Sequence, residues 1–262
     1  MNEITRNKEI YEALWSSDIT DYKSYSAGNL WYNRRIMKLI KKYVKIDTIK
    51  SLADIGCGDG SKTYLLSTIF KNASVVGFDL TEAAIYHAKN LYKRDNLRFE
   101  MAEASGVSGE YDIVSYLEVL EHIEDWKGTV KKMIFAPSKN SPKYLIISAP
   151  VGRMRKDELM DGHVRNFKKG EIEEFMTHMG YKTLIGSYGG FPFYSPLMRN
   201  FKELTRKHYE KTLGHKMSIF SKITHKLVSF LLCYCCFQNL KGDAFIGIFE
   251  RSEHDDNEKN YK

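Results

Sequence analysis

The chain has 262 residues, a formal net charge of +7, 43% hydrophobic residues and 13% aromatic residues. This length fits one α/β domain with additions, and the composition supports a sizeable core and excludes a largely disordered chain. The basic balance favours anionic partners such as nucleic acid, phosphorylated or nucleotide-linked metabolites or an acidic membrane face, although a lysine-rich solvated surface explains it at least as well.

The cysteine distribution and the hydropathy of the chain indicate its redox compartment and its relation to membranes. Three of the four cysteines crowd into positions 233–236, which is a poor disulfide framework and favours a reduced, cytoplasmic setting. Segment 1–10 is polar and lacks the apolar core of a signal peptide. The longest apolar run, 227–237, falls well short of the roughly 20 residues that a membrane-spanning helix needs. No transmembrane helix is expected, and contact of a helix with a membrane surface is left open.

Strand and helix signals alternate through most of the chain. The polar segment 1–30, dotted with aromatic residues, predicts an N-terminal helical lid or arm, and apolar residues at helical spacing predict a helix over 31–45. Strands are then expected at 51–55, 74–78, 97–101, 112–117, 144–149 and 182–188, and helices at 61–70, 81–92, 126–135 and 169–179. Such alternation with continuous apolar strands predicts a parallel sheet covered on both faces.

Residues 190–240 interrupt this rhythm with a turn-rich start and a basic, amphipathic helical pattern, and 245–249 reads as a last strand. The apolar run within this segment suits either the core or a homodimer interface. The expected division of the chain is an N-terminal lid or arm at 1–30, a main domain at 31–189 and 241–252, a helical insertion at 190–240 that covers the active-site edge, and a polar tail at 253–262.

A glycine-rich turn, Asp54-Ile55-Gly56-Cys57-Gly58-Asp59-Gly60, follows the first strand. Ligands of open parallel sheets bind at the carboxyl ends of the strands, and glycines let the backbone approach them closely. Nicotinamide and adenosylmethionine binders both use such turns, but the dinucleotide fingerprint needs Gly or Ala where this chain has Ser61. An NAD(P)-binding oxidoreductase is therefore disfavoured but left open, as is a binding protein without catalysis.

Acidic residues follow the next three strands. Asp79 lies 21 residues after Gly58, where a carboxylate can accept hydrogen bonds from ribose hydroxyls or cap the next helix. Glu103 follows the third strand, where it can accept from an exocyclic amine such as adenine N6 or be a plain turn residue. Two carboxylates, Glu118 and Glu121, follow the fourth strand. The acids therefore gather at one predicted edge of the sheet.

In order and spacing, the segments 54–60, 75–80, 99–104 and 111–125 resemble the motifs of class I S-adenosylmethionine-dependent methyltransferases. The resemblance implies a Rossmann-like, seven-stranded, mostly parallel sheet with an antiparallel last strand, and S-adenosyl-L-methionine as cofactor. The family often has aspartate at position 103, where this chain has the longer glutamate. The implied cofactor-binding residues are Asp54 in the turn that holds the cofactor, the backbone of Gly56, Cys57 and Gly58 at the methionine part, Asp79 and Leu80 at the ribose, Glu103 and Ala104 at the adenine, and Leu117 and Glu118 beside the sulfonium.

Two histidines are candidates for the base that removes the acceptor's proton, since histidine titrates near neutral pH. His122 follows the fourth strand and His163 lies in the loop after the fifth, so both should face the same edge. His122 can instead anchor the next helix, and His163 can be a loop residue without a role. Arg165 could steady an anionic acceptor.

Carboxylates and imidazoles at 118–122 and 163 also suit Mg²⁺, Mn²⁺ or Zn²⁺, and they resemble the pattern of small-RNA 3′-end 2′-O-methyltransferases. No residue is assigned as a metal ligand, and a metal-assisted RNA 2′-O-methyltransferase is kept as an alternative. The favoured acceptor is an O or N atom of a small molecule, a sugar or a phosphorylated or nucleotide-linked glycan precursor. Segment 162–181 and the insertion resemble methyltransferases of polysaccharide biosynthesis, so nucleic acid is the less favoured partner.

Overall fold

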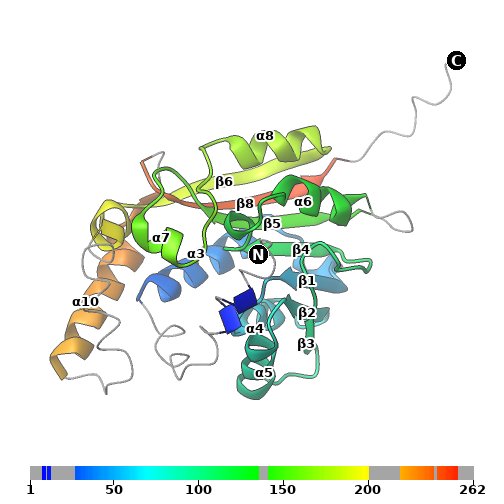
Figure 1. Cartoon of the computed structure of the whole chain (residues 1–262), viewed down its shortest axis with the longest axis horizontal. Coiled ribbons are helices and arrows are strands. Elements are labelled where there is room, and N and C mark those ends of the chain that lie inside the picture. Colours follow the sequence, from blue (N-terminus) through cyan, green and yellow to red (C-terminus); the bar gives the residue numbers. More distant parts are fainter. Residues whose placement is uncertain are drawn as a thin grey trace, which may run out of the picture.

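An eight-stranded sheet forms the centre of the computed structural model, with strand order β3-β2-β1-β4-β5-β8-β6-β7 (Figure 1). The structure describes residues 8, 9, 11, 12, 27–135, 141–200, 219–238 and 241–252, of which 219–225, 237 and 238 by backbone alone. The strands are β1 (Ser51–Ile55), β2 (Ser74–Asp79), β3 (Leu97–Met101), β4 (Ile113–Leu117), β5 (Tyr144–Pro150), β6 (Tyr181–Phe191), β7 (Phe237–Gln238) and β8 (Ala244–Arg251).

The sheet has the predicted mixed topology. Strands β1 to β5 pair in parallel, and β8 is antiparallel to both β5 and β6. Seven strands therefore form the expected mostly parallel sheet with an antiparallel last strand. The two-residue strand β7 is an addition that the sequence did not predict, and it pairs antiparallel with the end of β6.

Helices cover both faces of the sheet, as strand–helix alternation predicts. The helices are α3 (Ala27–Tyr43), α4 (Ser61–Ile69), α5 (Glu82–Leu91), α6 (Trp126–Ile134), α7 (Lys156–Met160), α8 (Glu171–His178) and α10 (Ile219–Cys235), with short turns η1 (Ile46–Thr48), η2 (Leu120–His122) and η3 (Phe193–Met198). Helices α3, α4 and α10 pack on one face, and α6 and α8 pack on the other. No helix among the described residues is long and apolar enough to cross a membrane.

The core lies on both faces because side chains of a strand alternate between them. On one face the ring of Trp126 packs edge-on against Phe167 and Phe175, with centroids 5.1 and 4.7 Å apart. On the other, Ile40 and Leu66 join the strand residues of that side. Every residue of β4 and β5 is buried, which accounts for sequences that are apolar apart from one serine in each strand.

Some element bounds differ from the predicted ones for identifiable reasons. Helix α3 begins at Ala27, four residues before the expected start. Pro150 belongs to β5, where it pairs with Ala244 at the very end of the strand. Helix α7 was not predicted, because its five residues are too few to show a helical period. In the expected insertion, η3 and α10 are described, and 201–218 lies outside the described residues.

Replacing Trp126 with alanine tests the core. The indole is 2% exposed, so its loss should leave a cavity and lower the free energy of unfolding by about 3–5 kcal/mol. Urea denaturation followed by circular dichroism measures this change. Tyr86→Ala is the matched control, because that ring is 66% exposed and its loss should stay within about 0.5 kcal/mol. Equal effects in the two variants would contradict the packing described above.

Candidate functional site

The glycine turn between β1 and α4 has a backbone that requires glycine. Gly56, Gly58 and Gly60 all adopt positive φ, at 69°, 54° and 80°, where glycine has no steric penalty. A Cβ at Gly56 would also lie 2.6 Å from the side chain of Val119. The turn therefore brings bare main chain to the carboxyl edge of the sheet, next to the loop that follows β4.

The buried side chain of Asp54 anchors this turn to the elements beneath it, α4 and β4. Its carboxylate is 2% exposed and accepts hydrogen bonds from Thr63 Oγ1 and Ser115 Oγ, both at 2.6 Å. Burial raises the pKa of Asp54, while the two hydroxyl donors act in the opposite direction. The side chain is thus engaged within the protein, and it connects the turn to α4 and β4.

Asp79 links the ends of β1 and β2. Its Oδ2 accepts from Gly58 N at 2.9 Å, and its Oδ1 accepts from Thr81 N at 3.0 Å and from Thr81 Oγ1 at 2.9 Å. Desolvation raises the pKa of Asp79. The backbone of Cys57 is held to the same strand, since its N–H donates to Phe78 O at 2.8 Å. Asp79 therefore stands beside the glycine turn, where the sequence predicted a ribose contact.

The other predicted cofactor residues border the same edge. Leu80 and Ala104 are half-buried, and Leu117 is buried at the end of β4. Glu103 is exposed and accepts a hydrogen bond from Ser105 Oγ. The predicted contact of Glu103 with adenine would have to compete with that local bond.

Glu118 has an unusual backbone and a distant partner. It adopts φ 64°, the one positive φ among the described non-glycine residues, and such conformations cluster at functional sites. Its Oε1 accepts a hydrogen bond from the hydroxyl of Tyr32 at 2.7 Å. Tyr32 lies 86 positions earlier on α3, so no local sequence pattern connects the two residues.

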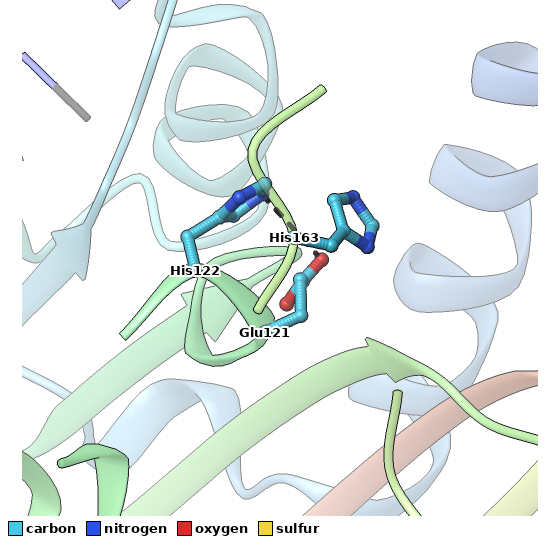
Figure 2. Close-up of side chains that lie close together, drawn as sticks. All are labelled: Glu121, His122 and His163. Carbon is cyan, nitrogen blue, oxygen red and sulfur yellow. Dashed lines mark ion pairs between the residues drawn. The ribbon is translucent and has the colours of Figure 1, made fainter. Parts of the chain in front are cut away.

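Two loops meet at the same edge and bring Glu121, His122 and His163 together (Figure 2). Glu121 and His122 belong to η2, and His163 belongs to the loop after α7. Val164 N donates to Glu121 O at 2.9 Å, which fixes the second loop against the first. The His122 and His163 rings pack edge-on with centroids 4.5 Å apart. Both predicted histidines therefore share one site.

The carboxylate of Glu121 is enclosed in protein. The residue is 1% exposed, and neither carboxylate oxygen accepts a hydrogen bond from a described residue. Burial raises the pKa of Glu121 well above its usual range. Burial, and secondarily the nearby His163, lower the pKa of His122 to about 3, so this imidazole is neutral at physiological pH.

These three residues have the chemistry of a metal site. One ligand atom from each of Glu121, His122 and His163 lies within 4.8 Å of the others. A tetrahedral ion bound at about 2.1 Å keeps its ligand atoms roughly 3.4 Å apart, so small side-chain rotations would complete the set. The carboxylate of Glu121 has no hydrogen-bond donor among the described residues, and His122 Nε2 lies 3.9 Å from its Oε1. Such a carboxylate fits a bound cation, because burying an uncompensated charge is costly. Glu118, the fourth residue of the suggested pattern, is bonded to Tyr32 instead.

The N-terminal segment contributes residues that sequence reasoning did not single out. Tyr11 Oη lies 2.8 Å from His122 Nδ1 and donates to Asp161 O at 2.9 Å. Glu12 accepts from the first backbone N–H groups of α5, at Glu82 and Ala83. The only sequence signal was the group of aromatic residues in 1–30.

Arg165, a candidate for steadying an anionic acceptor, donates to Glu124 O at 2.7 Å. This bond holds the loop after α7 against the loop after η2. The role that the structure displays for this side chain is therefore to join the two loops.

The fold and site are those of a Rossmann-like nucleoside-binding enzyme with acids and histidines at the edge of the sheet. Residues 29–184 match the family model described as "Methyltransferase domain", and the chain belongs to this family. The match confirms the predicted class, the S-adenosylmethionine-dependent methyltransferases, and argues against the oxidoreductase alternative.

Similar proteins agree with this assignment. The ubiquinone biosynthesis O-methyltransferase of Psychrobacter arcticus is 27% identical over an alignment of 177 positions, which covers 58% of this chain and 65% of that protein. The mitochondrial ubiquinone biosynthesis O-methyltransferase of Saccharomyces cerevisiae is 33% identical over 79 residues, 28% of this chain and 25% of that one. The matches thus span a quarter to two-thirds of these relatives.

A solved structure shares the fold over nearly the whole chain. Magnesium protoporphyrin IX methyltransferase from Synechocystis PCC 6803, with bound S-adenosylmethionine, superposes with a TM-score of 0.59 at 15% identity, covering 96% of this chain and 98% of that one. At this identity the similarity establishes the fold alone.

Removing the Asp79 carboxylate tests the predicted ribose contact. Asp79→Ala should abolish S-adenosylmethionine binding in isothermal titration calorimetry, because the ribose hydroxyls and Gly58 N lose their acceptor. Asp95→Ala, at an exposed position before β3, should bind as the unmodified protein does. Unchanged affinity in a folded Asp79→Ala variant would remove this assignment.

Proposed function

We propose that the chain transfers the methyl group of S-adenosyl-L-methionine to an oxygen atom of a small molecule. The observation that carries the proposal is the meeting of Glu121, His122 and His163 at the edge where the glycine turn and Asp79 lie. The two ubiquinone-pathway relatives are O-methyltransferases by name, which supports oxygen over nitrogen as the methylated atom.

In this reaction the acceptor oxygen attacks the methyl carbon, the carbon–sulfur bond breaks and neutral S-adenosylhomocysteine leaves. The acceptor's hydroxyl proton must go to a base as the new carbon–oxygen bond forms. His163 is half-buried and comes from the loop beside the site, so it takes the role of this base. The glycine turn and Asp79 contribute position, which is the protein's main task in a transfer between bound groups.

Within the small molecules, the acceptor class that the sequence favours is a sugar or a phosphorylated or nucleotide-linked glycan precursor, and a nitrogen atom is the alternative site of methylation. Fewer aromatic residues of the insertion are available to contact the acceptor than the sequence suggests, because Tyr194 stacks on Trp31 with centroids 4.6 Å apart. Phe191 and Phe193 remain half-buried candidates for stacking on a sugar face. The division into lid, main domain, insertion and tail, the cytoplasmic setting and a homodimer stay predictions alongside this one.

Tyr11 and Glu12 connect the N-terminal segment to the predicted active-site edge. By contacting His122 and the start of α5, they span the edge between the predicted acceptor and ribose positions. A segment seated there keeps water from the transferring methyl group.

A metal-assisted reaction is the second candidate, favoured by the enclosed carboxylate of Glu121. Glu121, His122 and His163 would hold Zn²⁺, Mn²⁺ or Mg²⁺. A bound ion acts as a Lewis acid that makes an acceptor hydroxyl easier to deprotonate. The specific metal-assisted enzyme that the sequence suggests is an RNA 2′-O-methyltransferase.

Replacing His163 tests the proposed base. His163→Ala should lower kcat by roughly 100- to 10,000-fold and leave the Kd for S-adenosylmethionine unchanged, with S-adenosylhomocysteine release as the assay across a panel of small hydroxyl acceptors. His178→Ala, on the exposed end of α8, is the matched control and should keep full activity. Full turnover in His163→Ala would discard the base assignment.

Metal content separates the two candidates. If the ion is bound, elemental analysis should find about one equivalent of Zn²⁺ or Mn²⁺ per chain, and Glu121→Gln should lose it along with its thermal stabilisation. Chelation should then abolish activity, and re-addition should restore it. A metal-free protein that keeps full activity after chelation rules out the metal-assisted reaction and leaves the His163 base in place.

A further inference from the structure

A cavity of about 380 Å³ opens between α3 and α10, apart from the predicted cofactor edge. From α3 it is lined by Trp31, Arg34, Arg35 and Lys38, which share one helix face at spacings of three and four residues. Gly190, Cys233, Tyr234 and Cys236 complete the lining. None of these residues belongs to the group of Glu121, His122 and His163, so this cavity needs its own explanation.

Arg35 is a buried cation that forms no ion pair with a carboxylate of the described residues. Its side chain is 6% exposed. It donates to Ala244 O at 3.3 Å, to Ser187 O at 3.3 Å and to Ser187 Oγ at 3.1 Å, and its Nε has no partner among the described residues. Its guanidinium also lies 4.8 Å from the Trp31 ring. Since an uncompensated buried charge is costly, an anion in the cavity would satisfy Arg35.

The charged residues of the two helices that line the cavity are all basic. The sequences of α3 and α10 contain no Asp or Glu. Arg34 and Lys38 are exposed at the mouth of the cavity, and Lys41 and Lys42 follow on the last turn of α3. The ligand is therefore an anion, and groups with spread negative charge such as phosphate suit a guanidinium best.

An exposed apolar strip adjoins these cations. Leu227, Phe230 and Tyr234 lie on one face of α10 and are 58%, 54% and 63% exposed, whereas Leu232 on the other face is buried. Arg34 joins the two features, because its Nη1 donates to the Tyr234 hydroxyl at 3.1 Å and its guanidinium lies 4.9 Å from that ring. A ligand that meets both features must be anionic and apolar at once.

We propose that the α3–α10 surface docks onto a bilayer that contains anionic phospholipid. A headgroup phosphate enters the cavity against Arg34, Arg35 and Lys38, and the strip of Leu227, Phe230 and Tyr234 rests at the boundary of headgroups and acyl chains. Basic residues beside exposed apolar side chains on a surface helix are the features of interfacial membrane binding.

Other occupants fit the surface less well. A soluble phosphate compound would leave the apolar strip in water. A two-fold dimer through this face would bring the cations of α3 close to their own copies, because such an interface places the same patch on both sides. The inference does not depend on which molecule accepts the methyl group.

Vesicle flotation with the full-length protein tests the proposal. The protein should bind vesicles of phosphatidylcholine with about 30% phosphatidylglycerol at least roughly tenfold more tightly than vesicles of phosphatidylcholine alone, and high salt should remove the difference. Equal binding to both vesicle types, or to neither, overturns it. Inorganic phosphate that binds with no vesicle binding, or dimers in sedimentation velocity with no vesicle binding, would assign the surface to those occupants instead.

Paired variants locate the contact. Arg34→Glu/Lys38→Glu should abolish binding to anionic vesicles, and the charge-matched control Lys131→Glu/Lys132→Glu, exposed on α6 across the sheet, should keep most of it. Phe230→Ser should weaken binding, and Tyr86→Ser, an exposed aromatic residue on α5, should not. All four sets change exposed side chains, so circular dichroism should show unaltered folds. Losses that are equal in the α3 variant and in its control contradict the proposed surface.

Discussion

The buried carboxylate of Asp54 is the interaction on which the cofactor edge depends. Its two short hydrogen bonds, to Thr63 and Ser115, connect β1 with α4 and β4 at the point where the glycine turn begins. A carboxylate inside a protein requires such donors, because it gives up its hydration on folding. The turn can therefore be bare glycine backbone and still hold one conformation. The two aspartates therefore have separate tasks. Asp54 stabilises the turn from inside the protein, and Asp79 lies beside the turn at the edge where the ribose is predicted to bind.

Much of the fold was predictable because its signals are local. The alternation of buried strands and amphipathic helices placed the main elements, and the positive φ values of Gly56, Gly58 and Gly60 agree with the predicted ligand turn. The carboxyl-edge rule then predicted that loops after successive strands would meet, and His122 and His163 do lie together. These inferences needed only period, turn chemistry and parallel topology.

What escaped prediction depends on contacts between residues far apart in the chain. Tyr32 reaches Glu118 across 86 positions, and Tyr11 reaches His122 across 111. A single sequence has no local pattern that pairs such residues. Arg35 shows the same limit, because its burial follows from the packing of α3 against β6, β8 and α10 and cannot be read from a basic helix. The cluster of Glu121 with two histidines could be suspected from the sequence, but its enclosure could not.

The left-handed backbone of Glu118 has a consequence for how this protein can change. A non-glycine residue in this conformation carries a conformational cost on the order of 1–3 kcal/mol, and glycine would relieve it. Glycine would also delete the acceptor of the Tyr32 hydroxyl and a carboxylate from the edge where the cofactor is predicted to bind. Position 118 is thus a point where thermostability and chemistry oppose each other. Stabilising substitutions should therefore keep Glu118 and be placed instead in solvent-exposed turns far from it.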